Sequence, residues 1–108
     1  MAISNYDTGK VITTVPIGKG VDAAGYDPAT ADAFASNGDG TFTVIHQDSP
    51  DQYHVAQTLA TPVGSRNMGL DPVTHKIFVV SAQFGPVPAG GRRGPILPDT
   101  FTLLTIER

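Results

Sequence analysis

The sequence predicts an all-β fold built from four-stranded antiparallel propeller blades, with about two blades in the chain. The composition is the first observation: 108 residues include 12 Gly and 9 Pro, which favours many short strands joined by turns. The second is a set of apolar and turn residues that recurs 44 positions further along. One four-stranded blade takes about 40–45 residues, so this period has the length of a blade.

The repeat is clearest at two turns, Asp27-Pro28-Ala29-Thr30 and Asp71-Pro72-Val73-Thr74, which are followed by Phe34 and Phe78. The same offset of 44 joins five further pairs: Asp7 and Asp51, Val11 and Val55, Val15 and Leu59, Gly20 and Gly64, and Tyr26 and Leu70. Helical repeats of similar length need helices of about 10–15 residues, which these Gly and Pro residues interrupt. The repeat therefore predicts strands.

The first part of the chain predicts one partial and one complete blade. Residues 1–20 are the end of a blade and contain its outer strand, Lys10–Val15. Residues 21–60 are a complete blade, in which Asp27-Pro28 starts a type I turn and Asn37–Gly40 supplies residues that tolerate positive φ. Its predicted strands are an inner strand with Ala23-Ala24-Gly25, then Ala33–Ser36, Thr41–His46 and the outer strand His54–Leu59.

Residues 61–108 predict a partial blade in the same single domain. Its inner strand contains Met68-Gly69, and its last strand is Phe101–Ile106. Aligning Phe42 with Phe101 gives an offset of 59, which implies a 15-residue insertion from about Gln83 to Asp99. Because this segment is rich in Gly and Pro, we expect it to form a loop.

Three segments give the sequence a likeness to a known family. Ala33-Phe34-Ala35-Ser36-Asn37 stands where that family has its Tyr-Val-Thr-Asn strand, and Asp7–Ile12 with Pro16-Ile17-Gly18 resembles its outer-strand motif. Phe84-Gly85-Pro86 and the C-terminal strand resemble the end of such proteins. The chain thus resembles the YVTN-type (YncE-like) β-propeller repeat proteins. The resemblance implies a propeller fold, a binding role, a periplasmic or extracellular location and, from one member, binding of single-stranded DNA.

One end of the predicted blades collects most of the candidate binding residues. Alternating strand direction places the connections between blades and the turn at Asn37–Gly40 at the same end. A small-molecule, protein or single-stranded nucleic-acid ligand, if the chain has one, is expected there, with Arg92 and Arg93 opposite an anion and Phe84 or Tyr26 as a stacking face. The alternative, which the sequence favours, is that these residues belong to solvated loops. The candidate residues are Lys19, Asp22, Asn37, Asp39, Arg66, Asn67, Arg92 and Arg93.

Other functions are disfavoured by composition and spacing. A net charge of −3 disfavours binding to duplex DNA. The sequence shows neither a signal peptide nor an apolar run of about 18 residues, so no membrane insertion is predicted. There is no cysteine, and His46, His54 and His75 lack the spacing of a zinc motif, so we expect them at strand surfaces or turns. No cofactor, metal or catalytic residue is predicted.

These observations favour a noncatalytic binding or scaffold module. The alternative is a metal-dependent, lactonase-like hydrolase with a site at Asp22, Asn37 and Asn67. Two blades cannot close a ring, so we expect a homo-oligomer in which Lys10–Val15 of one copy completes the blade that contains Phe101–Ile106 of another. Three chains, giving six blades, are favoured over four chains with eight.

Overall fold

The computed structural model describes residues 1–83, 85–86, 90 and 96–107. These residues contain no helix, which confirms the all-β prediction. They form nine strands: β1 (Ala2–Ser4), β2 (Val11–Thr14), β3 (Val21–Asp27), β4 (Asp32–Asn37), β5 (Thr41–Ser49), β6 (Gln52–Ala60), β7 (Arg66–Leu70), β8 (Ile77–Ser81) and β9 (Thr102–Ile106). The described part of the chain thus has no helix long and apolar enough to cross a membrane.

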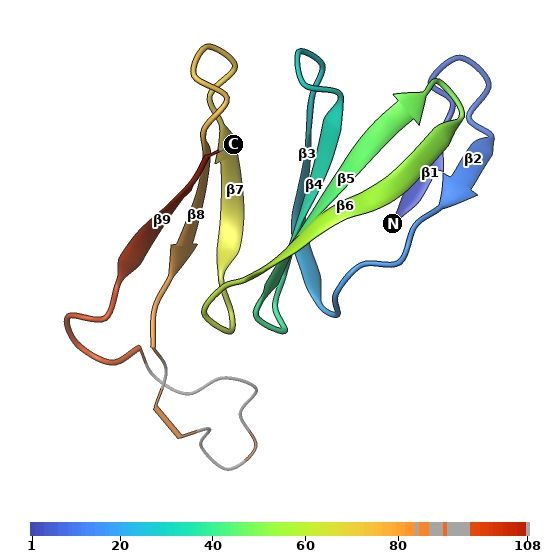
Figure 1. The fold of residues 1–108 in the computed structure, drawn as a ribbon. Helices are drawn as coiled ribbons and strands as arrows, with labels where there is room; N and C mark the ends of the chain where they lie inside the picture. Colours follow the sequence, from blue (N-terminus) through green and yellow to red (C-terminus); the bar gives the residue numbers. More distant parts are fainter. Residues whose placement is uncertain (84, 87–89, 91–95, 108) are drawn as a thin grey trace.

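The strands form three antiparallel sheets that lie side by side (Figure 1). The N-terminal sheet is β1-β2, the middle sheet is β3-β4-β5-β6, and the C-terminal sheet is β7-β8-β9. Within each sheet, strands that follow one another in sequence are paired. The first strand of the middle sheet, β3, contacts the first strand of the C-terminal sheet, β7. The three connections β2–β3, β4–β5 and β6–β7 reach the same end of the molecule (Figure 1).

The 44-residue repeat is also a repeat of backbone geometry. Gly25 lies opposite Phe34 in the middle sheet, and Gly69 lies opposite Phe78 in the C-terminal sheet. Positive φ recurs at Gly20 and Gly64 and again at Ala31 and His75. One β-bulge recurs too, because Ile12 is unpaired in β2 and Ala56, 44 positions later, is unpaired in β6. A bulge and a left-handed turn each fix the local path of a strand, so the repeats share a backbone path.

The predicted alignment of the last strand is wrong by two residues. Ser36 lies opposite Phe42, and its counterpart Val80 lies opposite Leu103. The structural counterpart of Phe42 is therefore Leu103, and Phe101 precedes β9 and is exposed. The insertion is two residues longer than predicted. A shift of two residues keeps the same sheet face, so alternation of apolar residues did not distinguish the two alignments.

Other strand bounds also differ from the predicted ones. β2 is shorter than Lys10–Val15, whereas β5 and β6 extend beyond Thr41–His46 and His54–Leu59 toward each other. They meet in a tight turn at Pro50 and Asp51. Gln47 and Asp48, which follow the predicted strand Thr41–His46, thus belong to the outer part of a long hairpin.

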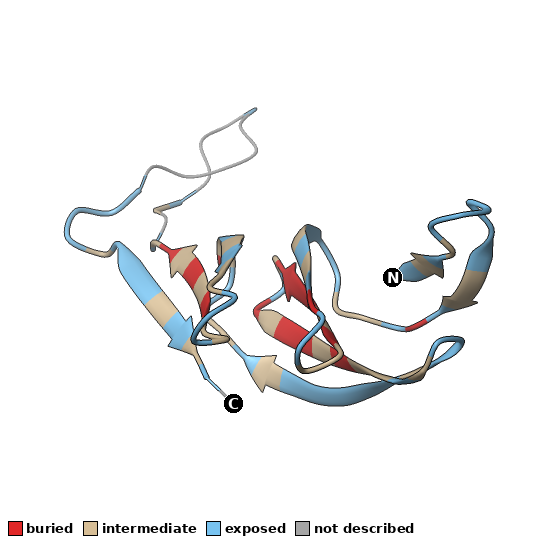
Figure 2. Ribbon diagram, turned by 90° about the horizontal axis from the view of Figure 1, so that it is seen from above, coloured by how far each residue is buried: buried red, intermediate tan, exposed pale blue. Residues whose placement is uncertain are grey.

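The main core lies between the middle and C-terminal sheets. Phe34 and Phe42 from the middle sheet are buried against Ile77 and Val79, and the two phenylalanine rings stack with their centroids 5.9 Å apart. Figure 2 shows the buried residues concentrated in β4, β5 and β8. A Cβ atom on Gly25 would lie 3.1 Å from the sulfur of Met68, so glycine at this position allows β3 and β7 to approach closely.

Candidate functional site

The connections at one end hold Lys19 and Asp39 together through turn hydrogen bonds. The backbone N–H of Lys19 donates to the Asp39 carboxylate at 2.9 Å, and the N–H of Asp39 donates to the Lys19 carbonyl at 3.2 Å. The hydroxyl of Thr41 also donates to Asp39, at 2.6 Å. This hydroxyl, followed by the Lys19 N–H, lowers the pKa of Asp39 from its ordinary value. The carboxylate therefore stabilises the β4–β5 turn.

Asn37 is at the same end but is completely buried. Its side-chain amide donates to the hydroxyls of Thr41 and Thr43, at 3.1 and 3.0 Å. As one of the candidate binding residues, Asn37 is predicted from the sequence to lie on a surface that faces a ligand. The structure instead places its amide inside the middle sheet, where it joins β4 to β5.

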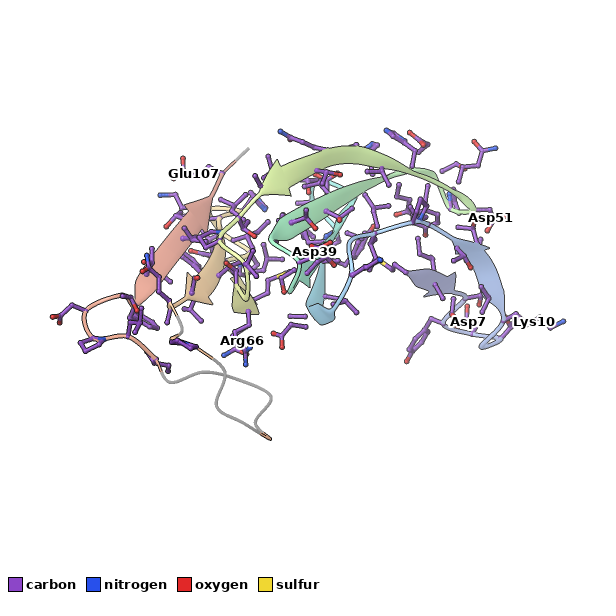
Figure 3. The ribbon with its side chains drawn as sticks, turned by 90° about the horizontal axis from the view of Figure 1, so that it is seen from below. Asp7, Lys10, Asp39, Asp51, Arg66 and Glu107 are labelled. Carbon is purple, nitrogen blue, oxygen red and sulfur yellow. The ribbon has the colours of Figure 1, made fainter. Side chains whose placement is uncertain are left out.

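Asp22 and Asn67 connect the middle and C-terminal sheets. The carboxylate of Asp22, an unpaired residue in β3, accepts a hydrogen bond of 2.8 Å from the backbone N–H of Asn67. Asn67 is the unpaired residue in β7 and has a φ of 56°. Arg66 donates to the Gly64 carbonyl at 3.4 Å, and Figure 3 labels it together with Asp39. Arg92 and Arg93 lie outside the described residues.

These contacts give the metal-dependent alternative no support. The Asn37 amide is directed to threonines, whereas Asp22 is bonded to the backbone of Asn67. Within the described ranges, no group of three or more His, Asp or Glu side chains has a geometry that could hold a metal ion.

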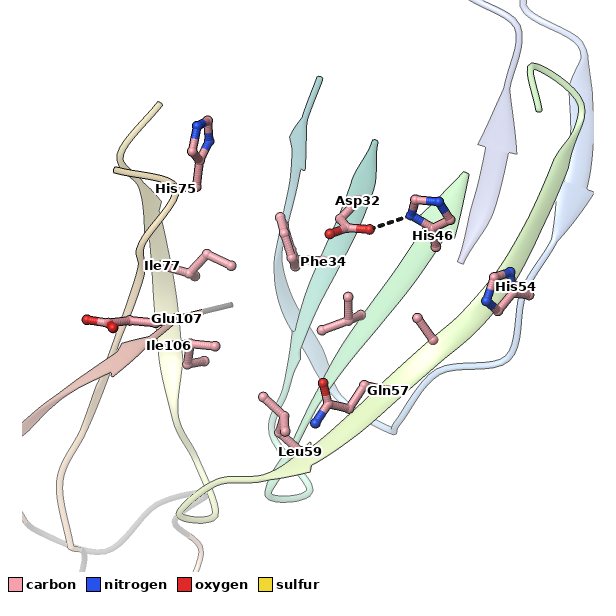
Figure 4. Close-up of a pocket in the computed structure, with 12 residues that line it drawn as sticks. Asp32, Phe34, His46, His54, Gln57, Leu59, His75, Ile77, Ile106 and Glu107 are labelled. Atoms are coloured by element: carbon pink, nitrogen blue, oxygen red, sulfur yellow. Dashed lines mark hydrogen bonds and ion pairs between the residues drawn. The ribbon is translucent and has the colours of Figure 1, made fainter. Parts of the chain in front are cut away.

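A second candidate site is a cavity of about 570 Å³ between the middle and C-terminal sheets. All three histidines of the chain line it, from β5, β6 and the β7–β8 turn (Figure 4). Its other described lining residues include Asp32, Glu107 and a group of apolar side chains, but no Ser, Thr, Cys or Lys. None of these residues offers a hydroxyl, thiol or amine as a nucleophile.

Each histidine in the cavity is oriented by an aspartate that contacts its Nδ1 atom. The distances are 2.7 Å from His46 to Asp32, 2.6 Å from His54 to Asp48 and 2.6 Å from His75 to Asp27. His46 and His54 lie directly opposite each other, with ring centroids 5.9 Å apart and edge to face. A carboxylate on Nδ1 fixes the ring and directs Nε2 away from that aspartate.

The His75–Asp27 pair joins two sheets, because Asp27 ends β3 and His75 lies in the turn after β7. Asp27 is almost fully buried. Burial raises the pKa of its carboxyl, but the N–H of Ala29 and then His75 outweigh burial and lower the pKa below its ordinary value. Asp27 thus caps its own turn and holds the neighbouring sheet.

The sequence did not predict this cavity or the shared location of the three histidines. His46 and His54 are separated by eight positions in sequence, and only the register of the long β5–β6 hairpin places them together. His46 and His54 are nearly the same number of residues away from Pro50-Asp51. A hairpin turn at Pro50-Asp51 would have predicted this pairing.

Comparison with known proteins found no matching family model, curated protein or solved structure.

Proposed function

We propose that the chain is a noncatalytic binding or scaffold module made of β-propeller-type blades, and that it assembles with further copies of itself. One observation carries the proposal. The outward face of the C-terminal sheet is the face turned away from the middle sheet. It carries residues whose counterparts, at the same positions of the repeat, are buried in the middle sheet. Phe42 is 0% exposed, whereas its counterpart Leu103 is 57% exposed. A face that is covered in one repeat and open in the next is a docking surface.

The glycines of the repeat support the same proposal. Gly25 has the Met68 sulfur against it, whereas a Cβ atom at its counterpart Gly69 would meet nothing within 4 Å. In the middle sheet this face is covered by the next sheet in the chain. A further sheet would cover the C-terminal sheet in the same way.

The opposite face of the middle sheet is the matching surface. The residues that pack against the middle sheet from the C-terminal sheet have counterparts 44 positions earlier: Met68 corresponds to Ala24, Leu70 to Tyr26, Ile77 to Ala33 and Val79 to Ala35. Contact between this surface of one copy and the outward face of another is head-to-tail, and such a contact forms a ring where its rotation closes. The proposed ring has three chains and six blades.

The ligand-binding face of this assembly is proposed at the end that carries the β2–β3, β4–β5 and β6–β7 connections. Lys19, Asp22 and Asp39 are exposed there, and Arg66 is half-buried beside them. The bonds that fix these turns hold the residues in position for a small molecule, a protein or single-stranded nucleic acid.

Sedimentation velocity of the wild type and Gly69→Lys tests the assembly. We expect a multiple of the 11.3 kDa chain mass for the wild type, with three chains favoured, and a monomer for Gly69→Lys. The lysine enters open space in the single chain, so the far-UV circular dichroism should not change. Gln52→Lys, an exposed change at the β5–β6 turn, should keep the wild-type mass. Ile3→Asp is a variant in which the pairing of β1 with β2 is weakened. If both the wild type and Ile3→Asp remained monomeric at micromolar concentration, the proposal would be contradicted.

A further inference from the structure

We infer that β1 and the β9 of a second copy pair with the same edge of β2. In the single chain β1 occupies this edge, so the N-terminal hairpin caps the docking site of the chain. The inference rests on the proposed assembly and names the surface at which it forms. It follows from the registers of three strand pairs and from the cavity beside β1.

The β1–β2 pair has the geometry of the β5–β6 pair. Ile3 lies opposite Thr13 with Ile12 unpaired, and Val44 lies opposite Gln57 with Ala56 unpaired. The unpaired residues are 44 positions apart. β1 therefore has the place of the third strand of a four-stranded sheet, and β2 has the place of the fourth.

β9 also has the place of a third strand. Val80 pairs with Leu103 as Ser36 pairs with Phe42. One edge of β9 pairs with β8, and within the described part of the chain no strand pairs with its other edge. The next strand for that edge is a fourth strand such as β2. A strand edge can pair with only one strand at a time. β1 and the β9 of a second copy therefore compete for the same edge of β2.

The cavity beside β1 lies where the first and second strands of a four-stranded sheet would pack against the middle sheet. It has a volume of about 540 Å³ and lies between β1 and the middle sheet. Its described lining includes Met1, Ile3, Ala24, Tyr26 and Ala33. Tyr26 is 46% exposed, although Ala35 and Ile45 on the same face are completely buried. The N-terminal sheet thus covers only part of the surface proposed to receive β7, β8 and β9.

The number of strands favours exchange of β1 for β9. β1 is a single strand, whereas β9 brings β7 and β8 with it. Docking of a second copy therefore keeps this edge of β2 paired and covers apolar surface on both copies. In the assembled state β1 is released from β2.

A reversible cross-link between β1 and β2 tests the inference. The chain has no cysteine, and directly opposite residues have Cβ atoms about 4.5–5.5 Å apart, close to the separation in disulfides. Ile3→Cys/Thr13→Cys should be monomeric when oxidised and should recover the wild-type mass after reduction. Ser49→Cys/Gln52→Cys, a directly opposite pair at the β5–β6 turn, should keep the wild-type mass in both states.

Ile3→Asp gives an independent measurement, because it weakens only the cap. Ile3 is half-buried in the single chain and has no contact with the second copy after exchange. We expect half-assembly at an approximately tenfold lower concentration than the wild type. An oxidised Ile3→Cys/Thr13→Cys chain with the full wild-type mass would overturn the cap but leave the assembly intact. If wild type and Ile3→Asp both stayed monomeric, the assembly and the cap would both be wrong.

Discussion

Two residues with positive φ show how different side chains serve the same turn in the two repeats. Ala31 has a φ of 58° between β3 and β4, and His75 has a φ of 63° between β7 and β8. The left-handed conformation brings Cβ too close to the following carbonyl, so alanine is strained there, whereas histidine is more common in this region. The backbone at Ala31 is still fixed, because its carbonyl accepts a hydrogen bond of 2.8 Å from the Gln47 N–H.

Ala31→Gly should therefore stabilise the fold by about 0.5–1 kcal/mol, since relief of strain exceeds the entropy that glycine adds to the unfolded chain. Ala29→Gly is the matched control in the same turn. Ala29 does not have a positive φ, so glycine should lower the free energy of unfolding there. Urea denaturation of both variants measures the two changes. Equal destabilisation by the two variants would show that Ala31 is not strained.

At the scale of the elements, the Asp27–His75 pair holds β3 to the β7–β8 turn, and its effect depends on pH. The pKa of Asp27 is lower in the folded chain than its ordinary value, so the unfolded chain binds the proton more readily. The stabilisation is present above the ordinary pKa of aspartate and is lost as the pH falls through the lowered value.

Asp27→Asn should thus destabilise the fold at pH 7, and the difference from the wild type should shrink as the pH falls from about 5 to below the lowered pKa. The change at pH 7 combines loss of the carboxylate that accepts from Ala29 with loss of the contact to His75. Urea midpoints of the two proteins across this pH range measure it. A difference that stayed constant down to pH 3 would rule out titration of Asp27 as the cause.

The elements also show what the sequence can and cannot predict. The Asp-Pro turns and apolar alternation predicted most strands, because turn chemistry and face alternation are local. The register of β9 was not predictable, since the insertion before it allows a two-residue shift without changing which face is apolar. The histidine cavity depends on pairing between β5 and β6 and on packing of the β7–β8 turn against Asp27. Likewise, the burial of Asn37 depends on its bonds to Thr41 and Thr43.

At the scale of the whole molecule, one polar pair that joins the sheets within a chain has no equivalent in the proposed contact between chains. Within the chain, Asp27 of the middle sheet meets His75 of the C-terminal sheet. In the proposed assembly the next contact uses their counterparts 44 positions away, Asp71 from one copy and Ala31 from the next. Alanine cannot make the bond that histidine makes. The contact between chains therefore lacks a polar pair that the contact within each chain has.

Ala31→His should supply that pair and strengthen the assembly by an amount on the order of tenfold in the dissociation constant. Histidine tolerates the positive φ of this position, and Asp71 already has a carboxylate fixed by the Val73 N–H at 2.9 Å. Sedimentation over a dilution series measures the dissociation constant. Ala31→His/Asp71→Asn is the control, because without the carboxylate the added histidine should lose most of its effect. If Ala31→His tightens the assembly equally with and without Asp71, the two residues do not meet, and the head-to-tail alignment of the copies is wrong.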